Sequence, residues 1–293
     1  MKSVWAFNPF DKNKKLEQKG VALIRGISSN FEDVEAVFVA SPDFLELSSA
    51  FNIPEKDRFT KYPKKLLDQA LGRLKIKLNK STVLVEDSIS LTSSVKTLTN
   101  YLAKNKMDLV VVASRAKVGL SRFVLGSFAE TLVHFSPVDL LIYNEQSTIA
   151  KKNPKNLLFA HDFSRSADKG LEKAIEYAKT WGSLLHVIHI PDPAFGFKFN
   201  GQSPEVEQYR KRVRQKLQGI ENKVASEGVF GSVEIDSNWS PVSERILAGA
   251  KSVKADFLLV VAKTGKLASF FGGSITRKIL RSSTVPVLVM KKI

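Results

Sequence analysis

Cysteine is absent from this chain of 293 residues, which excludes disulfides, thiolate zinc sites and cysteine nucleophiles. Histidine is scarce as well, with four residues. No uninterrupted apolar run approaches the roughly 18 residues that a membrane-spanning helix requires, so we expect no membrane partner. The N-terminal sequence MKSVWAFNPFDKNKK lacks a long apolar core and a small-residue cleavage site. We therefore expect no secretory signal and a cytoplasmic protein.

Acidic residues are too few to balance the basic ones. Lys and Arg number 45 against 29 Asp and Glu, which gives a formal net charge of +16. Residues 1–150 hold 21 basic and 16 acidic side chains, and residues 151–293 hold 24 and 13. Such an excess attracts nucleic acid, phosphate ligands or anionic membrane surfaces, or it is simply a solvated surface. The densest basic cluster, residues 210–216, lies in one predicted helix flanked by glutamates. This pattern is typical of an exposed helix face and argues against nucleic acid as a partner.

The chain contains an internal repeat. Residues 107–144 and 255–292 share one plan: an Asp before an apolar run, a loop with glycine, a Gly-Ser pair that opens an amphipathic helix, and a final apolar run. The two Gly-Ser pairs, at 126–127 and 273–274, lie 147 residues apart. The starts of the halves also correspond, SVWAFNPF with NLLFAHDF. The sequence therefore predicts a duplication, with domains at 1–146 and 153–293 and a polar linker at 147–152.

Each half alternates apolar runs with helical patterns. The runs are rich in Val, Ile, Leu and Phe on both faces, which suits parallel strands that helices cover on both sides. We expect an α/β fold with a doubly wound, five-stranded parallel sheet in each half. Helix-start signals, a serine followed by proline, stand at Ser203-Pro204 and Ser240-Pro241. Strands are predicted near 3–8, 34–40, 82–86, 108–113, 138–143, 156–161, 183–190, 232–236, 256–262 and 286–290.

A lone carboxylate, Asp162, ends the first predicted strand of the second half, and the Gly-Ser loop follows the fourth. In open parallel sheets, ligands bind outside the carboxyl ends of the strands, where the strand order reverses. Glycines let the backbone approach a phosphate, and a helix N-terminus offers unpaired N–H groups. Two structural alternatives stay open. The Gly-Ser pair can merely cap a helix, and Asp162 can cap the following helix together with Ser164 or Ser166.

The tandem repeat, the DFS at 162–164, the LLHVI at 184–188 and the loop with Gly-Ser resemble the universal stress protein family. The resemblance covers nearly the whole chain and is strongest to the tandem, E-type members, which implies the adenine nucleotide α-hydrolase-like fold. Some members bind ATP or AMP, with magnesium in the case of ATP. They use an Asp after strand one, the backbone of strand two and a loop reading G-x2-G-x9-G-[S/T]. The resemblance therefore implies a nucleotide site made by Asp162, Val187, Gly265, Gly273 and Ser274.

Each half departs from this family pattern. In the first half Asn8 takes the Asp position, and Ala113 and Ala116 replace two glycines, although the spacing to Gly126-Ser127 is kept. An added methyl obstructs a close backbone approach. The second half reads Ala262-x2-Gly265-x7-Gly273-Ser274, two residues short of the family loop. We therefore place the nucleotide in the second half, with Lys263 or Lys266 near the phosphates, and treat the first half as mainly structural.

Catalytic and metal sites are not predicted. His186 and His189 lie three apart in one strand and so point to opposite faces, which prevents joint metal ligation. His161 beside Asp162 lacks a serine nucleophile and an orienting group. We expect a protein that is not an enzyme, with slow ATP hydrolysis left open but without a residue to assign to it. The three tryptophans are expected to pack in cores, and the phenylalanine-rich segment 191–204 to form a loop that covers its own domain, a ligand or a partner.

The last predicted strand of each half, 138–143 and 285–290, is an apolar edge that favours pairing. Members of the resembled family usually dimerise through this strand, so we expect the two halves to pair internally as a pseudo-dimer. The predicted function is a stress-response sensor or adaptor for an unknown protein partner, with ATP or AMP in the second half. A protein-interaction scaffold without nucleotide is the alternative, and a basic nucleic-acid binder is a weaker one.

Overall fold

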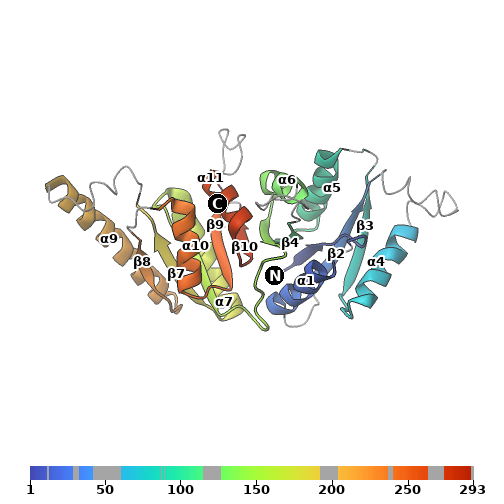
Figure 1. The fold of residues 1–293 in the computed structure, drawn as a ribbon, viewed down its shortest axis with the longest axis horizontal. Coiled ribbons are helices and arrows are strands. Elements are labelled where there is room, and N and C mark those ends of the chain that lie inside the picture. Colours follow the sequence, from blue (N-terminus) through green and yellow to red (C-terminus); the bar gives the residue numbers. More distant parts are fainter. Residues whose placement is uncertain are drawn as a thin grey trace. The chain divides into compact units, whose positions relative to one another are not determined.

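The computed structural model describes residues 1–11, 13–28, 33–41, 61–86, 88, 90–114, 127–191, 204–236, 240–262 and 274–291 (Figure 1). It divides into two compact units, 1–152 and 153–291, which are treated below as the first and second domain. Within the described residues, no helix is long and apolar enough to cross a membrane.

The first domain is a five-stranded sheet in the order β3-β2-β1-β4-β5. All four neighbouring pairs in it are parallel. Helices α4 and α1 contact the sheet, and α5 packs on α6. The elements are β1 (Ser3–Ala6), α1 (Lys14–Ile27), β2 (Val34–Ala40), α4 (Lys61–Arg73), β3 (Lys80–Val85), α5 (Leu91–Lys104), β4 (Leu109–Ala113), α6 (Ser127–Phe135) and β5 (Asp139–Tyr143).

The second domain repeats this plan with the order β8-β7-β6-β9-β10, again with parallel neighbours. The doubly wound parallel sheet predicted for each half is therefore confirmed. The elements are β6 (Asn156–Ala160), α7 (Arg165–Trp181), β7 (Leu184–His189), α9 (Pro204–Ser226), β8 (Val233–Ile235), α10 (Val242–Ser252), β9 (Phe257–Val261), α11 (Ser274–Ser282) and β10 (Val287–Met290).

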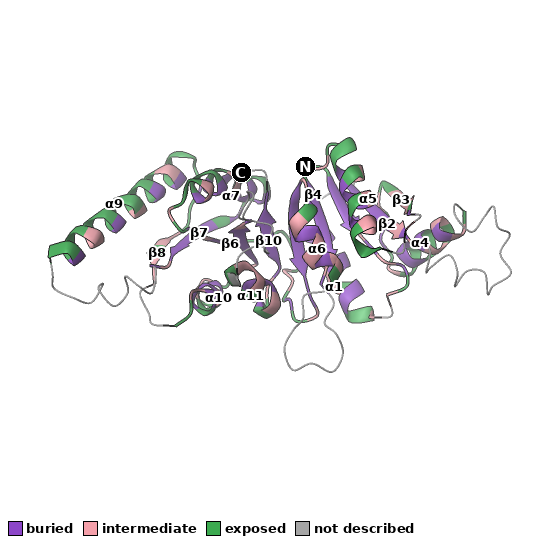
Figure 2. Ribbon diagram, turned by 90° about the horizontal axis from the view of Figure 1, so that it is seen from above, coloured by how far each residue is buried: buried purple, intermediate pink, exposed green. Residues whose placement is uncertain are grey.

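The central strands are buried because helices cover both faces of each sheet (Figure 2). In β4, Leu109, Val110 and Val111 are fully buried, and in β9 so are Leu258 and Leu259. Helices show a buried stripe and an exposed side instead, as their amphipathic pattern requires. Trp5 and Trp181 belong to these cores, as predicted, whereas Trp239 lies outside the described residues.

The aspartate that precedes the fourth strand of each half has the same structural use in both domains. Asp108 Oδ2 accepts a hydrogen bond from the Lys2 backbone N–H at 2.8 Å, and Asp256 Oδ2 accepts one from the Lys155 N–H at 2.7 Å. Each carboxylate thus satisfies a donor just before the neighbouring central strand. This shared bond explains why an Asp stands before the apolar run in both repeats.

Two local expectations need correction. Helix α10 begins at Val242 and has Pro241 at its N-cap, so it starts one residue later than the Ser240-Pro241 signal predicted, without a side-chain cap. The predicted linker 147–152 also starts inside the first domain. Ser147 is fully buried, its hydroxyl accepts the N–H of Asn144 at 2.9 Å, and its carbonyl accepts a bond from the Lys19 ammonium. The polar residues of this segment are therefore not all exposed to solvent, since Ser147 is buried and makes hydrogen bonds within the first domain.

Candidate ligand sites at the carboxyl ends of the strands

The strand order reverses between β1 and β4 in the first domain and between β6 and β9 in the second. These two switch points are the expected positions for ligands. Hydrogen bonds fix how they correspond: the Phe7 N–H donates to the Val37 carbonyl at 3.0 Å, and the His161 N–H donates to the Ile188 carbonyl at 2.9 Å. Phe7 therefore corresponds to His161, and the next residue, Asn8, corresponds to Asp162, as the family pattern predicted.

Hydrogen bonds at the end of the fourth strand allow the length of the loop before the Gly-Ser pair to be compared between the two domains. The Ser114 N–H donates to the Tyr143 carbonyl, and the Ala262 N–H donates to the Met290 carbonyl, so Ser114 corresponds to Ala262. Counted from these strand ends, the loop before the Gly-Ser pair is one residue shorter in the second domain than in the first. Matching the glycine pattern made the second loop two residues shorter than the family loop. Counting from the paired strand ends makes it one residue shorter than the loop of the first domain.

Asp162 has an exposed side chain at the end of β6 and takes part in starting α7. Its Oδ1 accepts the Ser164 N–H at 3.0 Å, and the Ser164 hydroxyl caps the helix by accepting the Ala167 N–H at 3.1 Å. The structural alternative for Asp162 is therefore present, with Ser164 as the capping partner. The same bond holds the exposed carboxylate at the switch point between β6 and β9.

Val187 lies in the middle of β7 with 1% of its surface exposed. Its backbone N–H donates to the Ser232 carbonyl at 2.7 Å, so the sheet already uses this donor. A nucleobase that took a bond from this N–H would have to displace the pairing with the segment leading into β8. The predicted backbone contact with adenine stays a prediction.

The other predicted site residues are described only in part. Gly265, Gly273, Ala116, Gly126, Lys263 and Lys266 lie outside the described residues, as do residues 192–203 of the phenylalanine-rich segment. Ser274 is the first residue of α11, which agrees with the predicted helix start after the glycine. Ala113 is the last residue of β4, at the wall of the first domain's cavity.

A pair of buried histidines behind Asp162 was missed by reasoning from sequence. His189 Nδ1 donates to the His161 carbonyl at 2.8 Å, and the Phe163 N–H donates to His161 Nδ1 at 3.0 Å. Burial lowers the pKa of His161 to about 4, and burial likewise lowers the pKa of His189. Both rings are therefore neutral at physiological pH. Their positions, at the ends of two neighbouring parallel strands, are the sequence signal that could have found them.

Phe163 covers this pair with a strained backbone. Its φ is 59°, which non-glycine residues adopt rarely, and its ring stacks on His189 at a centroid distance of 3.8 Å. The ammonium of Lys216 lies 5.0 Å from the Phe163 ring centroid, a cation–π distance. Nearby, Arg245 is 4% exposed and its Nε lies 3.4 Å from Asp236. The second domain therefore places cations around an aromatic floor next to Asp162.

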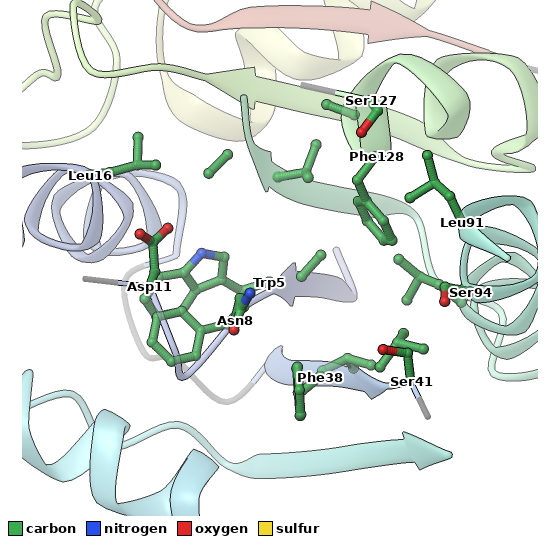
Figure 3. A pocket seen from close by; sticks show the side chains of 18 of the residues that line it. Trp5, Asn8, Asp11, Leu16, Phe38, Ser41, Leu91, Ser94, Ser127 and Phe128 are labelled. Carbon is green, nitrogen blue, oxygen red and sulfur yellow. The ribbon is translucent and has the colours of Figure 1, made fainter. Parts of the chain in front are cut away.

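The first domain has a cavity of about 610 Å³ at its own switch point (Figure 3). It is bounded by the ends of β1, β2 and β4 and by residues of α1, α5, α6 and β5. Phe7 and Phe38 take the positions of His161 and His189 there, since Phe38 follows Val37 as His189 follows Ile188. Sequence reasoning treated this half as mainly structural and did not predict the cavity.

The helix after the Gly-Ser pair differs in charge between the domains. The first turn of α6 contains Glu130, whereas the first turn of α11 contains no acidic residue. Arg277 stands 147 residues after Glu130, the same offset that relates the two Gly-Ser pairs, and α11 also carries Lys278 and Arg281. A helix N-terminus attracts anions, and a carboxylate in its first turn already uses that attraction. The first turn of α11 therefore repels an anion less than the first turn of α6 does.

Comparison with known proteins agrees with the repeat. The model of the universal stress protein family matches residues 28–144 and 153–291. A universal stress protein of Mycolicibacterium smegmatis is 24% identical over 217 residues, which cover 71% of this chain and 69% of the relative. A universal stress protein from Archaeoglobus fulgidus superposes with a TM-score of 0.65 at 20% identity, covering 99% of this chain and 96% of that one. A Pseudomonas aeruginosa structure described as a putative universal stress protein gives 0.65 at 16% identity, with 99% and 93% covered.

Proposed function

Because the chain belongs to the universal stress protein family, as a tandem of two family domains, we propose that it binds ATP or AMP in its second domain. The nucleotide would lie at the switch point between β6 and β9. The observation that carries this proposal is the exposed Asp162 carboxylate, held at the end of β6 by its bond to the Ser164 N–H. In the resembled family, a carboxylate at this position meets the base and ribose.

The phosphates would lie toward the N-terminus of α11. Support comes from the absence of an acidic residue in the first turn of α11 and from Arg277 at that turn. The described residues contain no cluster of three or more side chains that could hold a metal ion. Magnesium would therefore arrive on the triphosphate of ATP, as Mg²⁺ commonly does, rather than in a protein cage. The first domain does not fit a nucleotide phosphate, since Glu130 occupies the matching helix turn.

The consequence of binding would be a signal to a protein partner rather than a reaction. Among the described residues around Asp162, the nearest titratable rings, His161 and His189, are buried and neutral, and each uses its Nδ1 in a bond to backbone. They shape the floor of the site. We therefore propose a nucleotide-dependent adaptor, with the cytoplasm as its location.

Calorimetric titration of ATP with magnesium tests the proposal. The wild type should bind one nucleotide per chain, and Asp162→Asn should weaken binding at least tenfold. Asn8→Ala, at the matching position of the first domain, is the control and should leave binding unchanged. Arg277→Gln should weaken ATP and AMP more than adenosine. Loss of binding in Asn8→Ala rather than in Asp162→Asn would disprove the proposal. So would the absence of binding heat at millimolar ATP in the wild type, and the nucleotide-independent scaffold would then be the remaining function.

The two domains are also proposed to pair within one chain through 138–143 and 285–290, as the apolar last strands of the repeat favour. The absence of native cysteine makes a direct test simple. One cysteine introduced into each of these segments should form a disulfide within single chains, and light scattering should report a monomer. A disulfide that joins two chains would contradict internal pairing.

A further inference from the structure

The cavity of the first domain has the size of a small-molecule site. Its volume of about 610 Å³ falls within the several hundred cubic ångströms typical of such sites. It lies at the carboxyl ends of β1, β2 and β4, where ligands of parallel sheets bind. Figure 3 shows the rings of Trp5, Phe38 and Phe128 around the hollow, together with the polar side chains of Asn8 and Ser94.

Buried aromatic side chains form one wall of the cavity. Trp5, Phe7, Phe38 and Tyr143 line it, and each is buried. The Trp5 ring is held from two sides, because its indole N–H donates to the Tyr143 hydroxyl at 3.4 Å and its centroid lies 4.6 Å from that of Phe7. Such a wall favours a flat apolar group, which can lie against the ring faces.

Asn8, which also lines the cavity, has an amide group whose orientation is determined by one hydrogen bond. Its Oδ1 accepts the Phe10 N–H at 2.9 Å. Because that N–H is a donor, the amide oxygen faces it and the NH2 group points away from it. Within the part of the chain that the structure describes, this NH2 group has no hydrogen-bond partner. Asn8 therefore offers the cavity an unused donor.

The second domain makes the same turn with the opposite hydrogen-bonding character. Asp162 Oδ1 accepts the N–H of Ser164, two residues later, at 3.0 Å, as Asn8 Oδ1 accepts that of Phe10. An ionised carboxylate has acceptors alone, whereas an amide held by its oxygen presents a donor. The backbone is therefore kept, and the group that a ligand meets changes from an acceptor to a donor.

Two further positions make the wall of the first domain more apolar. Phe7 and Phe38 correspond to His161 and His189 of the second domain. A phenyl ring has neither the donor nor the acceptor of an imidazole. The only hydrogen-bonding group among these three matched positions of the first domain is thus the Asn8 amide.

We propose that this cavity binds a flat, uncharged molecule that presents a hydrogen-bond acceptor, such as the carbonyl oxygen of an aromatic ketone, to the Asn8 amide. The ring of the ligand lies against Trp5, Phe7 and Phe38, and its acceptor takes a bond from Asn8 Nδ2–H. A ribose hydroxyl that would donate to a carboxylate meets a donor here instead, so AMP does not fit. The inference is independent of nucleotide binding in the second domain, because it rests on other residues and another ligand.

The test uses the full chain labelled with 5-fluorotryptophan and observed by fluorine NMR. The resonance of Trp5 is assigned by its loss in Trp5→Phe. Acetophenone supplies the carbonyl acceptor, and α-methylstyrene has nearly the same shape with a methylene group in place of the oxygen. Acetophenone should shift the Trp5 resonance in a saturable manner, whereas AMP should leave it unchanged.

Asn8→Asp separates the hydrogen bond from apolar contact. An Asp at this position can keep the bond to the Phe10 N–H, as Asp162 does with Ser164, but it no longer donates. The affinity for acetophenone should therefore fall about tenfold further than the affinity for α-methylstyrene. Asn100→Asp, an exposed position of α5 outside the described lining, adds the same charge and should alter neither affinity.

Several results would overturn the proposal. The first is the absence of a Trp5 shift with acetophenone at millimolar concentration, and the second is a shift with AMP. An unchanged acetophenone affinity in Asn8→Asp, or an equal loss for both probes, would show that the amide donates no bond to the ligand. An equal loss of acetophenone in Asn100→Asp would assign the effect to net charge and would exclude the proposed bond as well.

Discussion

His161 should make the stability of the second domain depend on pH. Its side chain is fully buried, and burial lowers its pKa from 6.5 to about 4, against the opposing attraction of Asp168, whose Oδ1 lies 3.4 Å from Nε2. In the unfolded chain the pKa returns to about 6.5. Between these two values the unfolded state binds more protons than the folded state. Stability is therefore retained above pH 6.5 and is lost as the pH falls toward 4.

The size of the effect follows from the shift. A difference of about 2.5 pKa units corresponds to about 3.4 kcal/mol, of which about 2 kcal/mol is lost between pH 7.5 and pH 5. Burial lowers the pKa of His186 and His189 as well, so their contributions have the same sign. The measured loss in the wild type should therefore exceed the part that His161 supplies.

The assay is urea unfolding at about pH 7.5 and pH 5, followed by the fluorescence of Trp181 and Trp239, the two tryptophans of the second half, in a Trp5→Phe background. His161→Asn keeps an oxygen that can accept the Phe163 N–H but cannot take up a proton. This variant should lose about 2 kcal/mol less than the wild type on acidification. His134→Asn, on α6 of the first domain, is the control. Equal pH dependence in the wild type and His161→Asn would refute the reasoning.

Three further predictions concern the packing of a helix, a helix cap and a buried carboxylate in an ion pair. Gly20→Ala should destabilise the first domain by about 1–3 kcal/mol in thermal melts, because an added Cβ would lie 2.7 Å from the Trp5 ring, whereas Gly72→Ala, with no atom within 4 Å, should be neutral or stabilising. Ser164→Ala should cost about 1 kcal/mol in urea unfolding through loss of the α7 cap. Arg73→Met should cost about 2 kcal/mol by leaving the Glu17 carboxylate without its ion pair, and adding Glu17→Gln should recover most of that loss.

The strands and their doubly wound parallel arrangement could be predicted from sequence, because the central runs are apolar on both faces and because the repeat shows the same plan twice. The position of Asp162 followed from the same pattern, and so did its structural partner Ser164. Matching SVWAFNPF with NLLFAHDF residue by residue would place Asn8 opposite His161. Strand pairing, which depends on hydrogen bonds between distant segments, places Asn8 opposite Asp162 instead.

The histidine pair and the cavity needed the structure. His161 and His189 are 28 residues apart and meet only because β6 and β7 are parallel neighbours that end together. The hydrophobic pattern of a single strand does not show that these two residues are neighbours. The cavity is bounded by side chains of α1, α5 and α6 as well as of four strands, and no single segment shows it. Its volume depends on which of these side chains leave space, and hydrophobic periodicity does not report that.

Duplication gives one chain two copies of the same switch point with different side chains around it. Both domains keep the switch point, the Asp before the fourth strand and the Gly-Ser helix start, since these determine where a ligand lies. The side chains around that position differ between the domains, with Asn8 opposite Asp162 and with Phe7 and Phe38 opposite His161 and His189. Glu130 in one domain and Arg277 in the other reverse the charge at a single helix turn, where a charge acts most strongly on a bound ion. The greater basic excess of the second half has the same sign as this difference between the two helix turns.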